Sequence, residues 1–406
     1  MEIFQHLHRL PKYKRLFIFY IFIIISSLPV VHFSQSISTG QASGPNLVHI
    51  LSENGLSQNT IHDILQDSKG FIWFATEDGL NKYDGYNFTV YKNSQEDEYS
   101  ISDNFIWTIF EDRSGVLWIG TNSGGLCKFD REKERFISYK NNPSDTNSLT
   151  LNNVRTICED REGYIWVGTE NGLDRFDREK NIFVHYRHDP KNIYSLSNNV
   201  VLAIFEDSGG DLWIGSDGGL DKVDKKNNKF FNYSFDPNNV NSLSNNVVLS
   251  IYQDKQGHIW IGTLKGLTKF DKKFGKFWRY VINDSKTNSI NSNRINSVLE
   301  DETGILWVGT EDGLFQLNRS TNKFSNIKPS SFPVTSVLND NDILSLFEDN
   351  SGLIWVGTAE NGIVKYDKER IKFKHYKHDP FNKNSLSNNT IRSLLLKLFL
   401  LKGSCL

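Results

Sequence analysis

The sequence predicts an all-β fold, a seven-bladed β-propeller of four-stranded antiparallel blades preceded by a signal or anchor segment. Three observations support this prediction. One motif occurs seven times, its copies lie about 47 residues apart, and apolar and polar residues alternate within each copy. A repeat of this length with a period of two residues is typical of a propeller blade, whereas a helical repeat would show a period of 3.6 residues.

The repeated motif consists of Asp, two residues, Gly, one residue, Ile or Leu, and Trp. Two residues after the Trp comes a Gly, except in the first copy, where Ala75 replaces it, and Thr or Ser follows. A Gly-Leu pair comes next and becomes Gly-Ile in the last copy. The seven motif tryptophans are Trp73, Trp118, Trp166, Trp213, Trp260, Trp307 and Trp355.

The fourth copy shows how one unit is expected to fold. Its apolar segments, residues 200–205, 212–215, 220–223 and 230–233, are separated by turns rich in Gly, Asp and Lys. A four-stranded sheet with two apolar faces cannot bury both of them alone, so the seven copies are expected to pack face to face in a closed ring. Residues 48–51 are expected to add an outer strand to the last blade.

The repeated residues are interpreted as structural. The Gly before each Trp is expected to adopt a positive φ, and the preceding Asp to accept hydrogen bonds from turn amides. The Trp is large enough to fill the wedge between neighbouring blades. Cys158 takes a position where other copies have Leu65 or Phe110, which favours an apolar packing role over a nucleophile.

The segments flanking the repeats differ in composition. Basic residues precede an apolar run at 16–25, the pattern of an export signal, so residues 1–38 are interpreted as a signal peptide or membrane anchor that directs the chain to the periplasm. The propeller is predicted over residues 46–376, and residues 377–406 as an incomplete eighth repeat with a divergent tail. Contact with the membrane is expected only through the N-terminal segment.

The repeat resembles a known family. Asp-x-x-Gly-x-[Ile/Leu]-Trp-[Ile/Val]-Gly-Thr, followed by Gly-Leu and later by Phe-x-x-Tyr, is similar to the two-component regulator propeller repeat, and residues 54–59 and 79–85 resemble that family's first repeat. In the family this repeat builds the periplasmic sensor region of hybrid histidine kinase regulators. The resemblance implies a sensor whose kinase and DNA-binding regions have no counterpart here, and the chain is interpreted as the N-terminal fragment of such a regulator.

Charge and motif content argue against several function classes. A net charge of -2 provides no basic excess for binding nucleic acid. The three cysteines are too scattered for a disulfide framework or a zinc cluster. No phosphate loop or Gly-x-Ser-x-Gly motif occurs, so neither enzymatic activity nor a cofactor is expected. A metal site is not expected at two histidine pairs, since residues i and i+3 of a strand face opposite sides: His185 with His188, and His375 with His378.

The candidate ligand site lies at the position that varies most among the copies, on the innermost strand of each blade. It is occupied in turn by His62, Trp107, Arg155, Leu202, Leu249, Asn296 and Leu344. An exposed Trp107 with His62, Arg155 and Asn296 would stack on a sugar ring and bond its hydroxyl groups. The alternative is that these side chains fill the axial channel or pack between blades.

The turns after the second strand of each blade are expected on the same face. Five of the seven carry a carboxylate, which disfavours an anionic ligand and tolerates sugar hydroxyls or a cation. The alternative is that these residues satisfy the backbone of their own turns.

The favoured function is therefore an extracytoplasmic sensor of an oligosaccharide or another small polar ligand, which would act in an intact regulator by shifting the geometry of a homodimer. A stand-alone secreted propeller that binds carbohydrate or protein is the main alternative. A propeller enzyme such as a lyase or a quinoprotein is a third.

Overall fold

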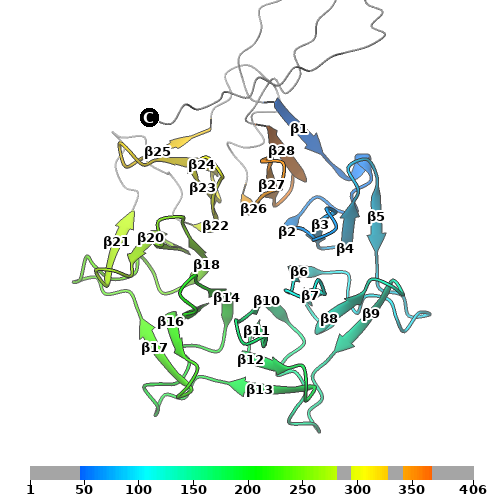
Figure 1. Cartoon of the computed structure of the whole chain (residues 1–406), viewed down its shortest axis with the longest axis horizontal. Helices are drawn as coiled ribbons and strands as arrows, with labels where there is room; N and C mark the ends of the chain where they lie inside the picture. Colours follow the sequence, from blue (N-terminus) through cyan, green and yellow to red (C-terminus); the bar gives the residue numbers. More distant parts are fainter. Residues whose placement is uncertain (1–45, 281–293, 328–341, 368–406) are drawn as a thin grey trace, which may run out of the picture. The chain divides into compact units, whose positions relative to one another are not determined.

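The computed structural model describes residues 46–280, 294–327 and 342–367. These residues form seven four-stranded antiparallel sheets arranged around a ring, together with one short 3-10 helix, η1 (Ser52–Asn54) (Figure 1). The prediction of a seven-bladed propeller is thus confirmed. The signal or anchor segment at 1–38 and the incomplete repeat at 377–406 lie outside the described residues. Among the residues that are described, no helix has the length and apolar character needed to cross a membrane.

Each of the first six blades consists of four consecutive strands. Blade 1 contains β2 (Ile61–Gln66), β3 (Ile72–Thr76), β4 (Gly79–Tyr83) and β5 (Phe88–Tyr91). Blade 2 contains β6 (Ile106–Glu111), β7 (Leu117–Thr121), β8 (Leu126–Asp130) and β9 (Arg135–Tyr139). Blade 3 contains β10 (Val154–Glu159), β11 (Ile165–Thr169), β12 (Gly172–Asp177) and β13 (Ile182–Tyr186). Blade 4 contains β14 (Val201–Glu206), β15 (Leu212–Ser216), β16 (Gly219–Asp224) and β17 (Lys229–Tyr233), close to the predicted segments.

Blade 5 contains β18 (Val248–Gln253), β19 (Ile259–Thr263), β20 (Gly266–Asp271) and β21 (Lys276–Tyr280). Blade 6 contains β22 (Ile295–Glu300), β23 (Leu306–Thr310), β24 (Gly313–Asn318) and β25 (Lys323–Asn326). Blade 7 contains β26 (Ile343–Glu348), β27 (Ile354–Thr358) and β28 (Ile363–Asp367), and its outer strand is β1 (Asn46–Ile50). Strand β1 runs antiparallel to β28, with Asn46 opposite Asp367 and Ile50 opposite Ile363. The start of the propeller therefore completes its last blade, as predicted for residues 48–51.

The motif Asp organises the turn between the first two strands of each blade. In blade 1 Asp67 Oδ1 accepts hydrogen bonds from the amides of Lys69 and Phe71, at 3.0 and 2.9 Å, while Gly70 adopts a φ of 92°. Asp67 Oδ2 accepts a bond of 2.7 Å from the indole Nε1 of Trp73. This Asp–Trp bond recurs in all seven blades at 2.7–2.9 Å. The turn geometry was predicted; the bond to the indole was not.

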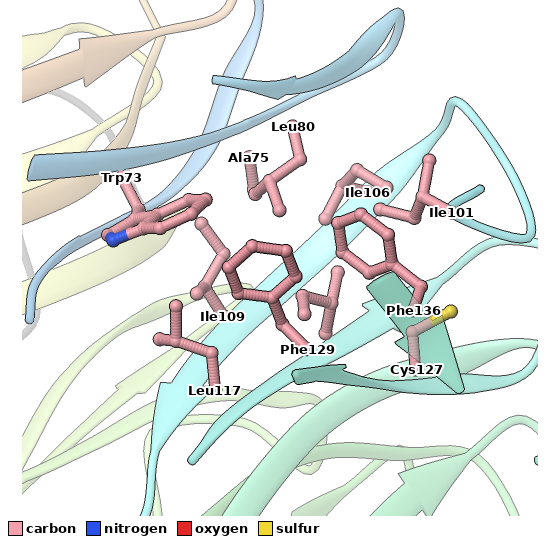
Figure 2. Packing of buried hydrophobic residues seen from close by; sticks show 11 residues of the cluster. Trp73, Ala75, Leu80, Ile101, Ile106, Ile109, Leu117, Cys127, Phe129 and Phe136 are labelled. Carbon is pink, nitrogen blue, oxygen red and sulfur yellow. The ribbon is translucent and has the colours of Figure 1, made fainter. Parts of the chain in front are cut away.

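The motif tryptophans fill the space between blades, as predicted. Trp73 is fully buried and packs with Ile109, Leu117 and Phe129 of blade 2 (Figure 2). Six similar clusters each combine a motif Trp with apolar residues of the next blade around the ring. Burying these large rings together with the aliphatic and aromatic residues around them stabilises the interfaces between blades.

Two kinds of polar contact also join neighbouring blades. The Glu or Gln that ends each innermost strand accepts a hydrogen bond from a turn amide of the preceding blade, at 2.6–3.1 Å in all seven interfaces. In five interfaces a basic residue directly after the third strand also forms an ion pair with the motif Asp of the preceding blade. These pairs are Arg131 with Asp67, Arg178 with Asp112, Lys225 with Asp160, Lys272 with Asp207 and Arg319 with Asp254.

The sixth copy departs from the repeat in sequence but not in fold. Asn318 replaces the Asp that ends the third strand, and its Oδ1 still accepts hydrogen bonds from the amides of Ser320 and Thr321. Ile327 replaces the final Tyr and is buried in the cluster around Trp307. The connection that follows this blade, residues 328–341, lies outside the described residues.

Candidate ligand-binding site

The variable position of each innermost strand coincides with an irregularity in the strand. In every blade the pairing between the first and second strands skips the second residue of the first strand, as in blade 1, where Ile61 pairs with Thr76 and Asp63 with Ala75. A bulge of this kind turns its unpaired residue away from the regular alternation of side chains. The seven variable residues are therefore the bulge residues, and all seven are half-buried.

Three of the four predicted site residues come together from three consecutive blades. The imidazole of His62 on β2 lies 4.5 Å from the indole of Trp107 on β6, measured between ring centroids. The guanidinium carbon of Arg155 on β10 lies 3.6 Å from the centre of the same indole ring. Phe105, directly before β6, packs 4.6 Å from Trp107 and 5.1 Å from His62. The result is a compact group that we call the axial cluster: His62, Phe105, Trp107 and Arg155.

Trp107 is half-buried rather than exposed, contrary to the prediction. One face of its ring is covered by Arg155, and its Nε1 donates a hydrogen bond of 3.2 Å to Asn122 Oδ1. Asn122 Oδ1 also accepts a bond of 3.0 Å from Asn153 Nδ2. The indole is thus fixed in place by its neighbours.

Acidic groups of the adjoining turns face the axial cluster. Glu77 Oε1 lies 3.3 Å from His62 Nε2, and Glu170 Oε1 lies 3.9 Å from Arg155 Nη1. Burial and the positive charge of Arg155 lower the pKa of His62 to about 4, so its imidazole is neutral at pH 7. Burial also raises the pKa of Asp217, and the nearby Glu170 adds to this effect. The site therefore combines one guanidinium, a neutral imidazole and several carboxylates.

Asn296 does not belong to the axial cluster. Its Nδ2 donates to Asp342 Oδ1 at 2.5 Å and to the backbone oxygen of Ile343 at 3.0 Å, while its Oδ1 accepts a bond of 2.9 Å from Arg294 Nε. These contacts join blades 6 and 7. The four predicted residues therefore form two separate groups, one spanning blades 1 to 3 and one at blades 6 and 7.

In six blades one amide of this turn is satisfied by a neighbouring hydroxyl group and not by a turn carboxylate. In blades 1 and 3 the turn amide is satisfied by the hydroxyl of the preceding Thr, as when Thr76 Oγ1 accepts from the amide of Asp78 and Thr169 Oγ1 from that of Asn171. The same arrangement holds in blades 4 to 7. Glu77 and Glu170 are exposed, and each contacts a basic side chain of the axial cluster, Glu77 with His62 and Glu170 with Arg155.

Sequence reasoning missed one residue that supports the cluster. Asp63 Oδ2 accepts hydrogen bonds from Thr108 Oγ1 at 3.0 Å and from the amide of Ile109 at 2.9 Å, so it holds the segment that directly follows Trp107. Burial raises the pKa of Asp63 to about 6. The signal was present in the sequence, because the other six blades carry a small residue here: Thr108, Thr156, Ala203, Ser250, Ser297 and Ser345.

His185, His188 and Cys158 occupy structural positions. His185 Nδ1 lies 2.7 Å from Asp174 Oδ1, a hydrogen bond that raises the pKa of His185, and His188 Nδ1 lies 2.8 Å from the backbone oxygen of Leu196. Within the residues described, no group of three or more ligand side chains is placed to hold a metal ion. His375 and His378 lie outside these residues. Burial raises the pKa of Cys158 to about 12, and its side chain packs against the cluster around Trp166, which agrees with an apolar role.

Known proteins match this chain in the repeat family, in sequence and in solved structure. The model of the two component regulator propeller matches residues 55–78, 100–123, 148–171, 195–218, 242–265, 289–312 and 337–360. A segment of 48 residues is 52% identical to histidine kinase P4 of Formosa agariphila, which corresponds to 12% of this chain and 4% of that protein.

Two solved structures place this fold among known propellers. The extracellular domain of the hybrid two component system BT3049 from B. thetaiotaomicron is 30% identical, with a TM-score of 0.68 over 84% of this chain and 44% of that one. Virginiamycin B lyase from Staphylococcus aureus is 14% identical, with a TM-score of 0.57 over 80% of this chain and 99% of that one, which shows a shared fold alone. The chain spans less than half the length of the first two relatives. Because each of its seven blades contains one match to the repeat, the chain belongs to the family of two-component regulator propeller proteins.

Proposed function

We propose that the propeller is the extracytoplasmic ligand-sensing part of a hybrid two-component signal transduction regulator. Two findings support this proposal: the seven regulator repeats, and the similarity to an extracellular domain of a hybrid two component system over 84% of this chain. In this proposal the propeller binds a ligand and catalyses no reaction. The ligand would change the packing of the propeller against its regulator partner, and a kinase region of the intact regulator would respond.

We further propose that the ligand is an oligosaccharide bound at the axial cluster. The observation that carries this proposal is the meeting of His62, Trp107 and Arg155 from three blades at the bulge positions. The Arg155 guanidinium stacks on Trp107 and lies 3.9 Å from Glu170, a distance that is too long for a hydrogen bond. Its N–H groups can therefore donate to ligand hydroxyls.

The surrounding groups suit hydroxyl groups better than a charged ligand. Glu77 and Glu170 accept hydrogen bonds from hydroxyls, Arg155 donates to them, and neutral His62 can do either, depending on which nitrogen carries the proton. Because the carboxylates already balance the guanidinium, a neutral sugar would bind without leaving an unpaired charge. The edge of the Trp107 ring that Arg155 leaves uncovered would contact the apolar C–H groups of the sugar.

Calorimetric titration of the full chain, purified in a mild detergent, against a panel of neutral oligosaccharides tests the proposal. Arg155→Leu and Trp107→Leu are suitable variants, because Leu202, Leu249 and Leu344 show that the ring accepts leucine at this position. Each is expected to weaken binding at least about tenfold, as the loss of one charged hydrogen-bonding group or one aromatic contact does elsewhere.

Leu249→Asn serves as the matched control, since Leu249 occupies the same bulge position in blade 5, outside the axial cluster, and Asn296 stands there in blade 6. It should leave oligosaccharide binding unchanged. Equal affinity of the wild type and both leucine variants for a bound oligosaccharide would place the sugar elsewhere on the propeller. If no oligosaccharide of the panel binds, the ligand class is wrong.

A further inference from the structure

A second surface, away from the axial cluster, differs in charge from the rest of the chain. Residues 219–280, which run from the third strand of blade 4 to the end of blade 5, contain eleven lysine and arginine residues, five aspartates and no glutamate. The whole chain has a net charge of -2. Segments 225–235 and 272–280, which include the outer strands β17 and β21, contain no acidic residue. Positive charge is thus concentrated on the outer side of two adjacent blades.

Blades 4 and 5 carry lysine at exposed positions where blades 2 and 3 carry glutamate. Lys226 and Lys273 are exposed in the turns that precede β17 and β21, whereas the equivalent residues of blades 2 and 3 are Glu132 and Glu179. Lys229 and Lys276, the first residues of the two outer strands, are also exposed. The same pattern therefore occurs twice, one blade apart.

Exposed aromatic rings accompany these lysines. Phe231 on β17 and Trp278 on β21 leave 43% and 38% of their surface accessible, and they occupy equivalent positions. Blade 3 has Val184 there. Cationic side chains lie against these rings and their neighbours: Lys269 Nζ is 5.1 Å from the Trp278 ring, and Lys229 Nζ is 4.6 Å from the Tyr194 ring, which itself contacts Phe231. We call this surface the basic rim: Lys226, Lys229, Phe231, Lys273, Lys276 and Trp278.

We propose that the basic rim binds an extended acidic polysaccharide. Its lysines complement a carboxylated polymer, and its two exposed rings offer flat apolar surfaces on which sugar rings stack. The same group, two lysines and an aromatic ring, occurs once in blade 4 and once in blade 5. A polymer with a repeating acidic unit could therefore contact both groups in the same way. This site is separate from the axial cluster, where carboxylates disfavour an anion, and it goes beyond the oligosaccharide-sensing function proposed above.

Binding of the full chain in a mild detergent to surface-immobilised polygalacturonate tests this inference, with fully methyl-esterified polygalacturonate as the uncharged polymer of the same backbone. The wild type is expected to bind only the charged form, and binding should weaken as salt rises from 0.05 to about 0.5 M because exposed charges are screened. The double variant K226E/K273E places in blades 4 and 5 the residues that blades 2 and 3 carry naturally. It should weaken binding roughly tenfold or more, since two attractive contacts become repulsive.

Two further variants separate local recognition from net charge. K69E/K140E changes the net charge by the same amount at exposed lysines of blades 1 and 2 and should bind within about twofold of the wild type. Trp278→Ser should weaken binding to polygalacturonate while the salt dependence stays the same, because a ring and not a charge is lost.

Several results would overturn the inference. These are the absence of binding to polygalacturonate, equal binding of the wild type and K226E/K273E, and an equal loss in K226E/K273E and K69E/K140E. Vesicles with 30% phosphatidylglycerol serve as the competing surface. If the wild type binds such vesicles and not the polymer, and K226E/K273E loses that binding, the rim recognises a lipid surface and the polysaccharide is wrong.

Discussion

In six of the seven blades a glycine stands two residues after the motif tryptophan, in close contact with the first strand of its own blade and of the next blade. A Cβ atom on Gly168 would lie 2.5 Å from Thr156 Cγ2 and 2.6 Å from Val201 Cγ1 of the next blade, closer than nonbonded carbon atoms approach. The equivalent residue of blade 1 is Ala75, which is fully buried without displacing the fold. The requirement for glycine therefore comes from packing between blades and not from its backbone angles.

Gly168→Ala tests this at the level of a single methyl group. We expect it to lower the free energy of unfolding by about 1–3 kcal/mol, because the added carbon overfills a closed interface. Urea denaturation of the full chain in detergent, followed by tryptophan fluorescence, measures the change. Ala75→Gly should cost less, about 1 kcal/mol, through backbone entropy. A neutral Gly168→Ala would show that the interface between blades 3 and 4 has room for the methyl group.

Asp63 makes a pH-dependent contribution of its own. Burial raises the pKa of Asp63 in the folded state to about 6, above its ordinary value of 3.8, so the folded state binds the proton more tightly than the unfolded chain. The stability that this carboxyl contributes is fully present below about pH 3.8 and is lost as pH rises through about 6.

Asp63→Thr, which introduces the residue found at this position in blades 2 and 3, removes the titration. We expect the stability difference, wild type minus variant, to fall between pH 4 and pH 7, as measured by urea denaturation at a series of pH values. Other carboxylates affect both proteins equally and cancel in this difference. A difference that is constant over this range would mean that Asp63 is already ionised at pH 4 in the folded protein.

At the scale of the secondary-structure elements, the ion pairs between blades connect the end of one third strand to the turn of the preceding blade. Arg178 lies 3.1 Å from Asp112 Oδ2 and 2.9 Å from Glu159 Oε1, and both carboxylates are nearly inaccessible to solvent. Removing the guanidinium would leave the buried Asp112 without a cationic partner, while Glu159 would keep only Arg113, at 3.8 Å. Such a loss is more damaging than that of an exposed pair.

Arg178→Ala is expected to lower the free energy of unfolding by roughly 2 kcal/mol, less than a fully buried pair because the arginine side chain is 29% exposed. Arg178→Lys should retain part of the stability, since Lys225 and Lys272 make the same contact in blades 4 and 5. Lys92→Ala removes the exposed pair with Asp78 and should change stability by less than about 1 kcal/mol. If both alanine variants behave alike in urea denaturation, the buried carboxylates have found other partners.

At the scale of the whole propeller, the ring is closed by contacts that differ from those at the other interfaces. At the interface between blades 7 and 1, Gly85 occupies the position that Arg131 and the equivalent basic residues occupy at five other interfaces. The ion pair with the motif Asp is therefore missing here, and no basic side chain of the described ranges pairs with Asp349. The junction instead uses the pairing of β1 with β28 and hydrogen bonds such as Thr60 Oγ1 to the backbone oxygen of Ala359, at 2.6 Å. This junction is therefore expected to be the weakest in the ring.

Hydrogen exchange measured by mass spectrometry tests where the ring opens. We expect amides of β28 to exchange faster than those of the equivalent strand β12, because regions with fewer stabilising contacts open at lower free energy. In Arg178→Ala the amides of β12 should accelerate, while those of β28 stay unchanged. Equal protection of β12 and β28 in the wild type would show that strand pairing alone closes the ring as firmly as the ion pairs do.

The amino-acid sequence by itself determined the number of blades, the strands within them and the role of the motif Trp and Gly. It did so because the repeat recurs about every 47 residues, and a period of two within a regular repeat leaves few other folds. Closure by β1 was also foreseeable, since the last blade needs an outer strand and the first segment has the right pattern. The Asp–Trp hydrogen bonds and the close contacts of Gly168 could not be predicted from the sequence, because both depend on the distance between strands and turns in the folded protein.

The axial cluster was decided by the tertiary structure. His62, Trp107 and Arg155 stand at the same place in three repeats, which the sequence shows, but their separation in space follows from the curvature of the ring and from the bulge that redirects each side chain. The same geometry covers the Trp107 ring with Arg155 and assigns Asn296 to a different pair of blades. Spacing along the chain specifies which positions are equivalent, whereas only the closed ring determines which equivalent residues touch.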